Sequence, residues 1–282
     1  NLKNIIIILS FVLLSAQSND VLSAYNLEHN LPNLSNQITL PLLNVEQLLE
    51  EDKNAQPGTP FRYGYKFDVD LSLNNSGEWV EIENGDRLWK LTIKSEGALA
   101  LFFNSNAFYL PIGSKLFIYN DDRSMFREYT NTDSKASMSF SSSSIKGDIM
   151  HLEYYEPYSV YNKGSINIIS IIHDYKDIFN ISRDIRDESC GDDVSEYLDE
   201  YKIQINATGL LDTRQGKICT GTLLNNQWEN ELGYYWTAWH CVNDYIASES
   251  LTAYYFENFR FYFDFKEGDQ YSYENSENYA TD

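Results

Sequence analysis

Apolar and polar residues alternate along much of the chain after residue 60, which is typical of strands that bury one face. In the segment RYGYKFDVDL, every second position is apolar: Tyr63, Tyr65, Phe67, Val69 and Leu71. Shorter apolar runs follow as LALFF, KLFIY, DIMHLEYY and SINIISIIH. Polar segments separate them, including the serine-rich SFSSSSIKGD, which we expect to be a connecting loop. This spacing predicts a β-sandwich over residues 60–180.

One turn of this sandwich can be predicted in detail. Asn84 and Gly85 lie between the strand-like runs of GEWVEIENGDRLWKLTI. Both residue types tolerate the positive φ angles of a two-residue hairpin turn, so we expect a tight β-hairpin here.

The first residues read as a secretory signal peptide over 1–18. Lys3 precedes an apolar run from Ile5 to Leu14 that only Ser10 interrupts, and the small residues Ser15 and Ala16 follow. A run of this length is too short to span a bilayer, which needs about 20 apolar residues. We therefore expect export, with no membrane partner for the mature protein.

Two segments read as connections between larger units. Residues 19–59 form a connector that includes a short amphipathic helix in LPLLNVEQLLEED, with Leu43, Leu48 and Leu49 on one side, and ends in the breaker-rich NAQPGTP. Residues 181–189 lie in a charged, apolar-poor stretch, FNISRDIRDES, that predicts a processing linker. The last unit then covers 190–282.

Composition supports a mainly β protein and excludes one class of partner. The chain has 22 tyrosines and 15 phenylalanines among 282 residues, and a formal net charge of −21. Aromatic residues favour strands. Nucleic acid is excluded because phosphate contacts need clustered Lys and Arg, whereas an acidic surface at most attracts cationic peptides. We expect a monomer without a cofactor.

Three cysteines, Cys190, Cys219 and Cys241, all lie in the last third of the chain. In an exported protein an odd number predicts one disulfide and one cysteine whose partner is elsewhere.

The candidate chemistry centres on His240. It follows a strand-like GYYWTA, and a polar loop connects that run to an earlier strand ending in CTGTLL. Two strands joined by a loop bring their far ends together, so a disulfide between Cys219 and Cys241 would fix the backbone beside His240, at about 3 kcal/mol of stabilisation. Thr237 and Ala238 are small and leave room beside the ring for a nucleophile.

Other interpretations of His240 are open on the residues alone. It could be a packed core histidine. A zinc site from Cys219, His240 and Cys241 lacks the usual ligand spacing, so no metal is expected. A nucleophilic Cys241 is disfavoured, since adjacent side chains on a strand point to opposite faces. His151 and His173 lie singly within strand-like runs and are interpreted as structural.

The motifs CTGTL and TAWHC resemble those of trypsin-like serine endopeptidases, in which the histidine of TAxHC is catalytic. The likeness is closest to secreted bacterial lysyl endopeptidases, which show CTGSLxNN, YFLTAxHC and then an aromatic strand similar to LTAYYFENF. SCGDDV resembles the start of their mature enzyme, and RYGYKFDVDLSLNNSGEW, LFIYNDD and IIHDYKDIF resemble their propeptide. The resemblance covers about residues 60–265.

This resemblance implies a fold and a function. The β-sandwich would be a propeptide, followed by the first part of a trypsin-like double β-barrel. The chain would be a secreted zymogen that hydrolyses protein or peptide substrates, after Lys by resemblance, with His240 as general base. Cys190 would pair with a cysteine further along. We place propeptide cleavage between Lys176 and Arg186, on the expectation that Lys176, Arg183 and Arg186 are exposed.

The chain departs from the family pattern in several ways. Trp239 replaces a small or polar residue, and the second cysteine that is common shortly after the first is absent, with Tyr197 nearby instead. No GxSG occurs after residue 240, so the nucleophilic serine is missing and the sequence as given is expected to be inactive. Asp282 is the candidate triad acid; Asp244 is too close to His240 along the chain. The alternatives are a secreted β-sandwich binding or adhesion module and an inactive pseudoprotease.

Overall fold

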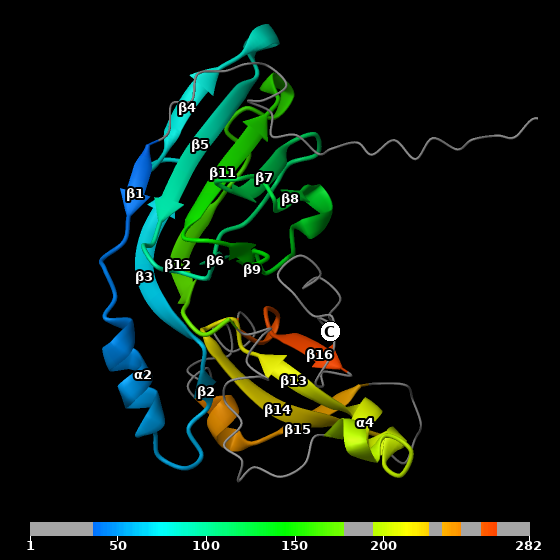
Figure 1. Ribbon diagram of the computed structural model, residues 1–282. Helices are drawn as coiled ribbons and strands as arrows, with labels where there is room; N and C mark the ends of the chain where they lie inside the picture. Colours follow the sequence, from blue (N-terminus) through cyan, green and yellow to red (C-terminus); the bar gives the residue numbers. More distant parts are fainter. Residues whose placement is uncertain (1–35, 178–193, 226–232, 244–254, 264–282) are drawn as a thin grey trace, which may run out of the picture.

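The computed structural model describes residues 36–177, 194–225, 233–243 and 255–263. These residues form three β-sheets and few helices, so the prediction of a mainly β protein is confirmed (Figure 1). The predicted signal peptide over 1–18, the predicted linker 181–189, Cys190 and Asp282 lie outside the described residues.

The first sheet has six strands in the order β1-β5-β11-β7-β8, with β4 also paired to β5. Their bounds are β1 (Gln37–Thr39), β4 (Glu78–Glu81), β5 (Arg87–Lys94), β7 (Lys115–Asn120), β8 (Phe126–Tyr129) and β11 (Ile149–Glu156). Pairing is antiparallel except for β1, which runs parallel to β5. Part of the predicted connector 19–59 is therefore a strand of this sheet. The sequence QIT is too short to show a periodic pattern, and its pairing with β5 holds it there.

The second sheet has five strands in the order β10-β6-β12-β3, with β9 also paired to β6. Their bounds are β3 (Gly64–Ser72), β6 (Ala100–Ser105), β9 (Phe140–Ser141), β10 (Ile145–Lys146) and β12 (Asn167–Asp174). All of these pairs are antiparallel.

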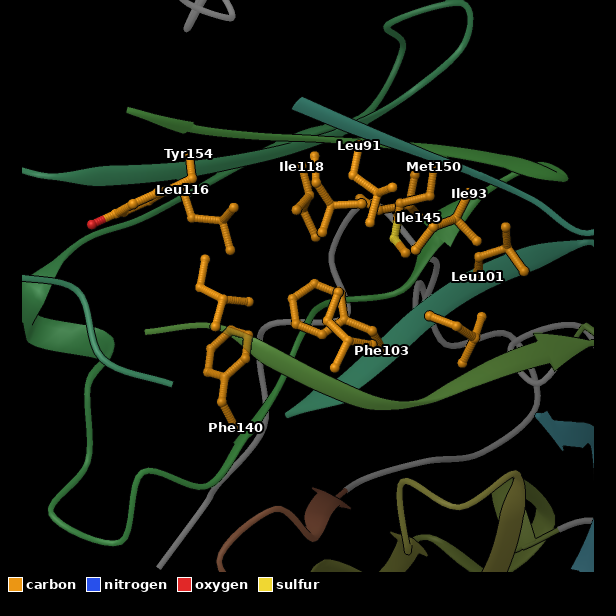
Figure 2. Packing of buried hydrophobic residues seen from close by; sticks show 14 of the residues in the cluster. Leu91, Ile93, Leu101, Phe103, Leu116, Ile118, Phe140, Ile145, Met150 and Tyr154 are labelled. Carbon is orange, nitrogen blue, oxygen red and sulfur yellow. The ribbon is translucent and has the colours of Figure 1, made fainter. Parts of the chain in front are cut away.

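The first and second sheets share one hydrophobic core and form a sandwich (Figure 2). Leu91 and Ile118 of the first sheet and Leu101 and Phe103 of the second are at most 1% exposed. Burying such side chains contributes about 1.5–3 kcal/mol each. The alternating pattern that predicted the strands therefore supplies the inner faces of both layers.

The predicted hairpin turn at Asn84 and Gly85 is confirmed. Their φ angles are 65° and 79°, and β4 and β5 pair on either side of them. The N–H of Ile82 donates to the carbonyl of Asp86 across the turn, so the connection spans three residues, Glu83–Gly85, rather than the two expected.

The third sheet has five strands in the order β15-β14-β13-β16, with β2 paired to β14. Their bounds are β2 (Phe61–Arg62), β13 (Thr208–Asp212), β14 (Lys217–Leu224), β15 (Tyr234–Thr237) and β16 (Arg260–Phe263). Strand β2 directly precedes β3, so one stretch of chain joins the third sheet to the sandwich (Figure 1). No sheet closes into a barrel within the described residues, so the predicted double β-barrel is not observed there.

Short helices complete the described part of the chain. Helix α2 (Val45–Lys53) lies in the predicted helical segment; Asn44 caps it by accepting a hydrogen bond from the N–H of Gln47 at 3.1 Å, and Leu48 is its buried residue. The others are α4 (Lys202–Ala207) and the 3₁₀ turns η1 (Glu83–Gly85), η2 (Asn131–Asp133), η3 (Tyr158–Val160), η4 (Val194–Tyr197) and η5 (Trp239–Cys241). None of the helices described is both long and apolar enough to cross a bilayer.

One sequence interpretation is incomplete and another is wrong. The serine-rich segment connects strands as expected, but residues 139–144 are all buried at 9% exposure or less, where they contact the third sheet. The aromatic segment LTAYYFENF is not one strand over its described part: Tyr255 and Phe256 are helical, and the strand begins at Arg260. Asn258 ends that helical turn and is itself buried against Ser139, to which it donates a hydrogen bond.

Lys176 is not the exposed cleavage residue that the sequence predicted. Its Nζ lies 2.6 Å from Asp52 Oδ2, and only 11% of its side chain is exposed. The ammonium group also lies 4.4 Å from the centre of the Phe61 ring. Asp52 receives further hydrogen bonds from Arg62 and Tyr175, so Lys176 is part of a cluster that joins α2 to the sandwich.

Candidate functional site

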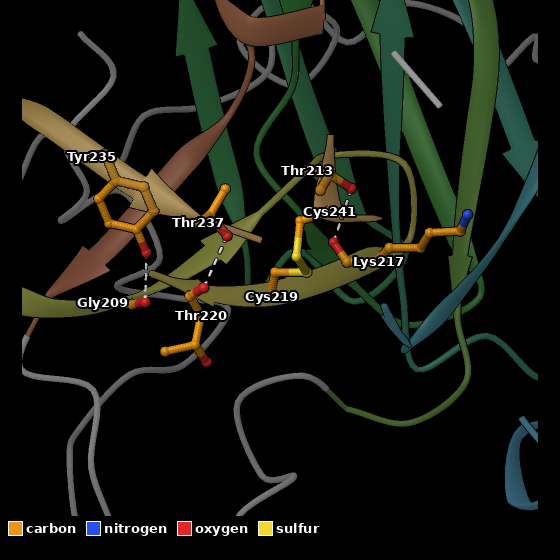
Figure 3. Close-up of a disulfide and its surroundings, with 8 residues drawn as sticks. All are labelled: Gly209, Thr213, Lys217, Cys219, Thr220, Tyr235, Thr237 and Cys241. Atoms are coloured by element: carbon orange, nitrogen blue, oxygen red, sulfur yellow. Dashed lines mark hydrogen bonds between the residues drawn. A yellow bond between two sulfur atoms is a disulfide. The ribbon is translucent and has the colours of Figure 1, made fainter. Parts of the chain in front are cut away.

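The candidate site is built on the β14–β15 hairpin of the third sheet. The two strands pair with Gly221 opposite Thr237 and Leu224 opposite Tyr234. Near its open end, the hydroxyl of Thr237 donates a hydrogen bond to the carbonyl of Thr220 at 2.9 Å (Figure 3). This bond joins the residues that precede His240 to the strand that carries Cys219.

Tyr235 anchors the same hairpin to the rest of the third sheet. Its hydroxyl donates to the carbonyl of Gly209 at 2.6 Å (Figure 3). Its ring meets Phe261 edge-on with 4.6 Å between centroids. Burial raises the pKa of this hydroxyl to about 12, so it remains a donor at neutral pH. Tyr235 therefore fixes the β14–β15 hairpin to the rest of the third sheet by both packing and hydrogen bonding.

A disulfide between Cys219 and Cys241 closes the unit, as predicted. The S–S distance is 2.00 Å and the Cα atoms are 6.1 Å apart (Figure 3). Cys241 is buried, and its N–H donates to the carbonyl of Ala238 at 3.0 Å within turn η5. The backbone of His240 is therefore held on one side by the strand and on the other by the disulfide.

The His240 side chain is exposed, which overturns the interpretation as a packed core histidine. The hairpin ends at Thr237, and the 3₁₀ turn that follows directs Cys241 rather than His240 inward. Within the described residues, His240 makes no hydrogen bond or ion pair. The ring is accessible to a partner from outside this part of the chain.

The disulfide also decides between the chemical alternatives. The sulfurs of Cys219 and Cys241 lie close to a ring nitrogen of His240, all within 4.8 Å of one another. The two sulfur atoms are bonded to each other in the disulfide. Neither is therefore the thiolate that zinc ligation or nucleophilic attack requires. His240 is left as the titratable group of this cluster.

Two features around His240 could not be predicted from the sequence. A turn of the N-terminal connector lies beside the ring, since a Cβ placed on Gly58 would be 3.7 Å from His240 Nδ1. The neighbouring aromatic residues Trp236 and Trp239 are each 67% exposed. The first feature brings together residues far apart in the chain, and no local pattern signals such a contact.

Other residues considered from the sequence are located as follows. His151 lies in β11, with Nδ1 2.9 Å from the hydroxyl of Thr92, and His173 is buried in β12, so both lie in strands of the sandwich. Outside the described residues are Cys190, Asp282, Asp244, Arg183 and Arg186.

The three sheets and the Cys219–Cys241 disulfide define this chain as a disulfide-stabilised, mainly β protein. It presents an exposed histidine at the end of a β-hairpin. Residues 185–280 match a family described as "Lysyl endopeptidase, C-terminal domain", which links the chain to lysyl endopeptidase-like proteins and gives it a protease context. The match includes the whole hairpin and His240. No solved structure matches the chain.

Proposed function

We propose that the chain is part of a secreted serine endopeptidase zymogen in which His240 is the general base. In this reaction the imidazole takes the proton of a serine hydroxyl as it attacks the peptide carbonyl, and returns it to the leaving amine. The observation that carries the proposal is the exposed imidazole held beside the Cys219–Cys241 disulfide, within the segment that matches the lysyl endopeptidase family.

The geometry of the hairpin supports this role for His240. A general base must meet its nucleophile at hydrogen-bond distance, so its backbone needs a fixed position. The disulfide, the Thr237 hydroxyl and the packing of Tyr235 supply that position. The exposed ring edge leaves space for an approaching hydroxyl.

The remaining parts of the mechanism extend beyond the described residues. A serine nucleophile in a glycine-flanked turn and a carboxylate for the imidazolium are both required. We propose that the third sheet is part of a trypsin-like double β-barrel and that these groups belong to the rest of it, with Asp282 as the candidate carboxylate. Export fits the disulfide, which persists in oxidising compartments. Cleavage after Lys is proposed from the family match alone.

The test is covalent labelling with a fluorophosphonate, which reacts with activated serines. Protein expressed from the complete reading frame that contains this sequence should label and should hydrolyse Lys-containing peptides, whereas protein ending at Asp282 should do neither. His240→Ala should abolish both signals. His151→Ala removes a histidine from the sandwich and should leave labelling unchanged.

Two results would contradict the proposal. Labelling that persists in His240→Ala means that the serine is activated by another group. Complete protein that never labels, with the disulfide formed, favours a secreted binding module in which the exposed Trp236 and Trp239 make the contacts.

A further inference from the structure

The turn between β13 and β14, residues 213–216, enters the N-terminal sandwich. This segment is called the docking turn below. It carries Arg214, which is 1% exposed and has one of the largest of the fully buried side chains described. The guanidinium carbon lies 3.4 Å from the centre of the Phe102 ring in β6. Arg214 has φ of 56°, and a bulky residue keeps this conformation only where its surroundings fix it.

The guanidinium group is hydrogen-bonded by the serine-rich segment that the sequence suggested was a loop. Nε donates to Ser141 Oγ at 3.0 Å, Nη2 donates to the carbonyl of Ser142 at 2.6 Å, and Nη1 lies 3.5 Å from Ser144 Oγ. Residues 139–144, called the serine cradle, are all buried. A run of small hydroxyl side chains suits this position because it leaves room for a guanidinium and supplies acceptors for it.

The charge of Arg214 is balanced by Asp212, the last residue of β13, directly before the docking turn. Nη1 donates to Asp212 Oδ2 at 2.9 Å, and both side chains are buried. Asp212 Oδ1 accepts hydrogen bonds from the hydroxyl of Tyr63 at 3.0 Å and from the N–H of Arg214 at 2.8 Å. Removing an ion pair from water is costly unless its remaining polar atoms are satisfied. The sandwich satisfies them with uncharged groups only, from Tyr63 and the serine cradle.

Backbone contacts hold the docking turn in the same place. The carbonyl of Gly216 accepts hydrogen bonds from the N–H groups of Tyr63 and Gly64 at 2.9 and 3.1 Å. A Cβ on Gly216 would lie 2.4 Å from the Gly64 oxygen, and its φ is +76°, so glycine is required. Asn104 of β6 donates to the carbonyl of Arg214 at 2.9 Å. The site therefore recognises both the backbone and the side chain of the turn.

We propose that the N-terminal sandwich is a receptor for an arginine presented on a tight turn beside an aspartate, and that this site keeps the two parts of the protein bound after the chain between residues 177 and 194 is cut. The ligand is the docking turn of the same chain. Processing of the linker then yields a two-chain complex, and separation needs a further event. The proposal does not depend on protease activity.

The experiment uses the full chain with a recognition sequence for a site-specific protease inserted between Asp177 and Val194. After cutting, the two fragments should elute together in native gel filtration and separate in denaturant. Arg214→Ala leaves Asp212 buried without its partner, which should raise the dissociation constant about 100-fold or more. Arg214→Lys keeps the charge but loses the planar fork, so it should also weaken the complex.

Arg123→Ala is the matched control. Arg123 also has a positive φ, of 60°, and also lies in a turn, but its side chain is exposed. Its replacement should change the dissociation constant less than twofold. The same assay in a His240→Ala background should give the same result, which separates this proposal from the proposed catalytic function.

Two outcomes overturn the proposal. One is separation of the unsubstituted fragments on dilution to about 1 µM, which corresponds to a weak complex. The other is equal affinity for the Arg214→Ala and Arg123→Ala proteins. If Arg214→Ala does not fold, the double variant Ser141→Ala with Ser144→Ala tests the site from the sandwich side. Its two lost hydrogen bonds should weaken binding about tenfold. Unchanged affinity of this double variant also overturns the proposal.

Discussion

His173 should make the sandwich less stable in mild acid. Its ring is fully buried in β12, with Nδ1 2.7 Å from the hydroxyl of Ser95. Among the described residues, no group forms a hydrogen bond with Nε2. Burial lowers the pKa of this imidazole from 6.5 to about 4, and the carboxylate of Asp148 opposes the shift only in part. The folded protein therefore holds His173 neutral at pH 7.

The sign and size of the effect follow from these two pKa values. Above about pH 6.5 neither the folded nor the unfolded chain protonates this residue, so His173 has no effect on the pH dependence. Below that, the unfolded chain takes up a proton that the folded chain excludes, and the free energy of unfolding falls until about pH 4. The total loss is about 3 kcal/mol at most, and about 2 kcal/mol is reached at pH 5.

The assay is urea unfolding of wild type and His173→Gln at pH 7.5 and pH 5.0, followed by tryptophan fluorescence, since Trp89 is fully buried in the same core. The many carboxylates titrate in both proteins, so their effect cancels in the difference. The stability of wild type relative to the variant should fall by about 2 kcal/mol between the two pH values. A wild-type advantage over His173→Gln that is constant with pH would refute the reasoning.

Two further predictions concern the disulfide and Lys176. Replacing both Cys219 and Cys241 by Ser should cost about 3 kcal/mol in the unfolding of the third sheet, because the 22-residue separation gives a loop of substantial entropy in the unfolded chain; an unchanged denaturation curve would contradict this. Trypsin should not cut after Lys176 in the folded protein, because Asp52 holds its ammonium group at 2.6 Å. Asp52→Asn should admit that cut, seen by peptide mass, whereas the exposed control Glu50→Gln should not; equal digestion of the two variants would count against the ion pair as the cause.

Much of the sandwich could be predicted because its strands carry their own pattern. Strands β3, β5, β11 and β12 alternate or run apolar over eight or nine residues, which is long enough for a periodic signal. The Asn84–Gly85 turn is fixed by local backbone preference. These features depend on neighbours in the sequence, so the sequence alone reveals them.

The contacts between the sandwich and the third sheet could not be predicted in this way. Ser141, Ser142 and Ser144 have the composition of a loop, and two buried arginines more than 60 residues later, Arg214 and Arg260, donate hydrogen bonds to them in the folded chain. Lys176 looks like an exposed basic residue until Asp52 is brought to it by the folded chain. Buried polar residues need partners, and partners distant in sequence leave no local signal.

The hairpin and the disulfide of the candidate site could be predicted from the positions of its cysteines. The order of Cys219, His240 and Cys241 indicates a hairpin closed by a disulfide, and the structure has both. The sequence does not determine whether His240 is buried or exposed, because a histidine at the end of a strand can point toward the core or toward solvent. It is decided by the 3₁₀ turn at Trp239–Cys241, which places Cys241 inward.

The position of Gly58 beside His240 relates the proposed function to the docking of the N-terminal sandwich on the third sheet. In a catalytic triad, one ring nitrogen of the histidine faces the serine and the other donates to the orienting carboxylate. Here Gly58 lies beside Nδ1, and the connector that carries it continues directly into β2, which pairs with β14. Cutting the chain between residues 177 and 194 leaves β2 paired and Gly58 in place. The rest of the His240 ring is exposed. Under the proposed function, a carboxylate that approaches Nδ1 therefore meets the turn at Gly58, and this turn stays beside the ring until the sandwich is released from the docking turn.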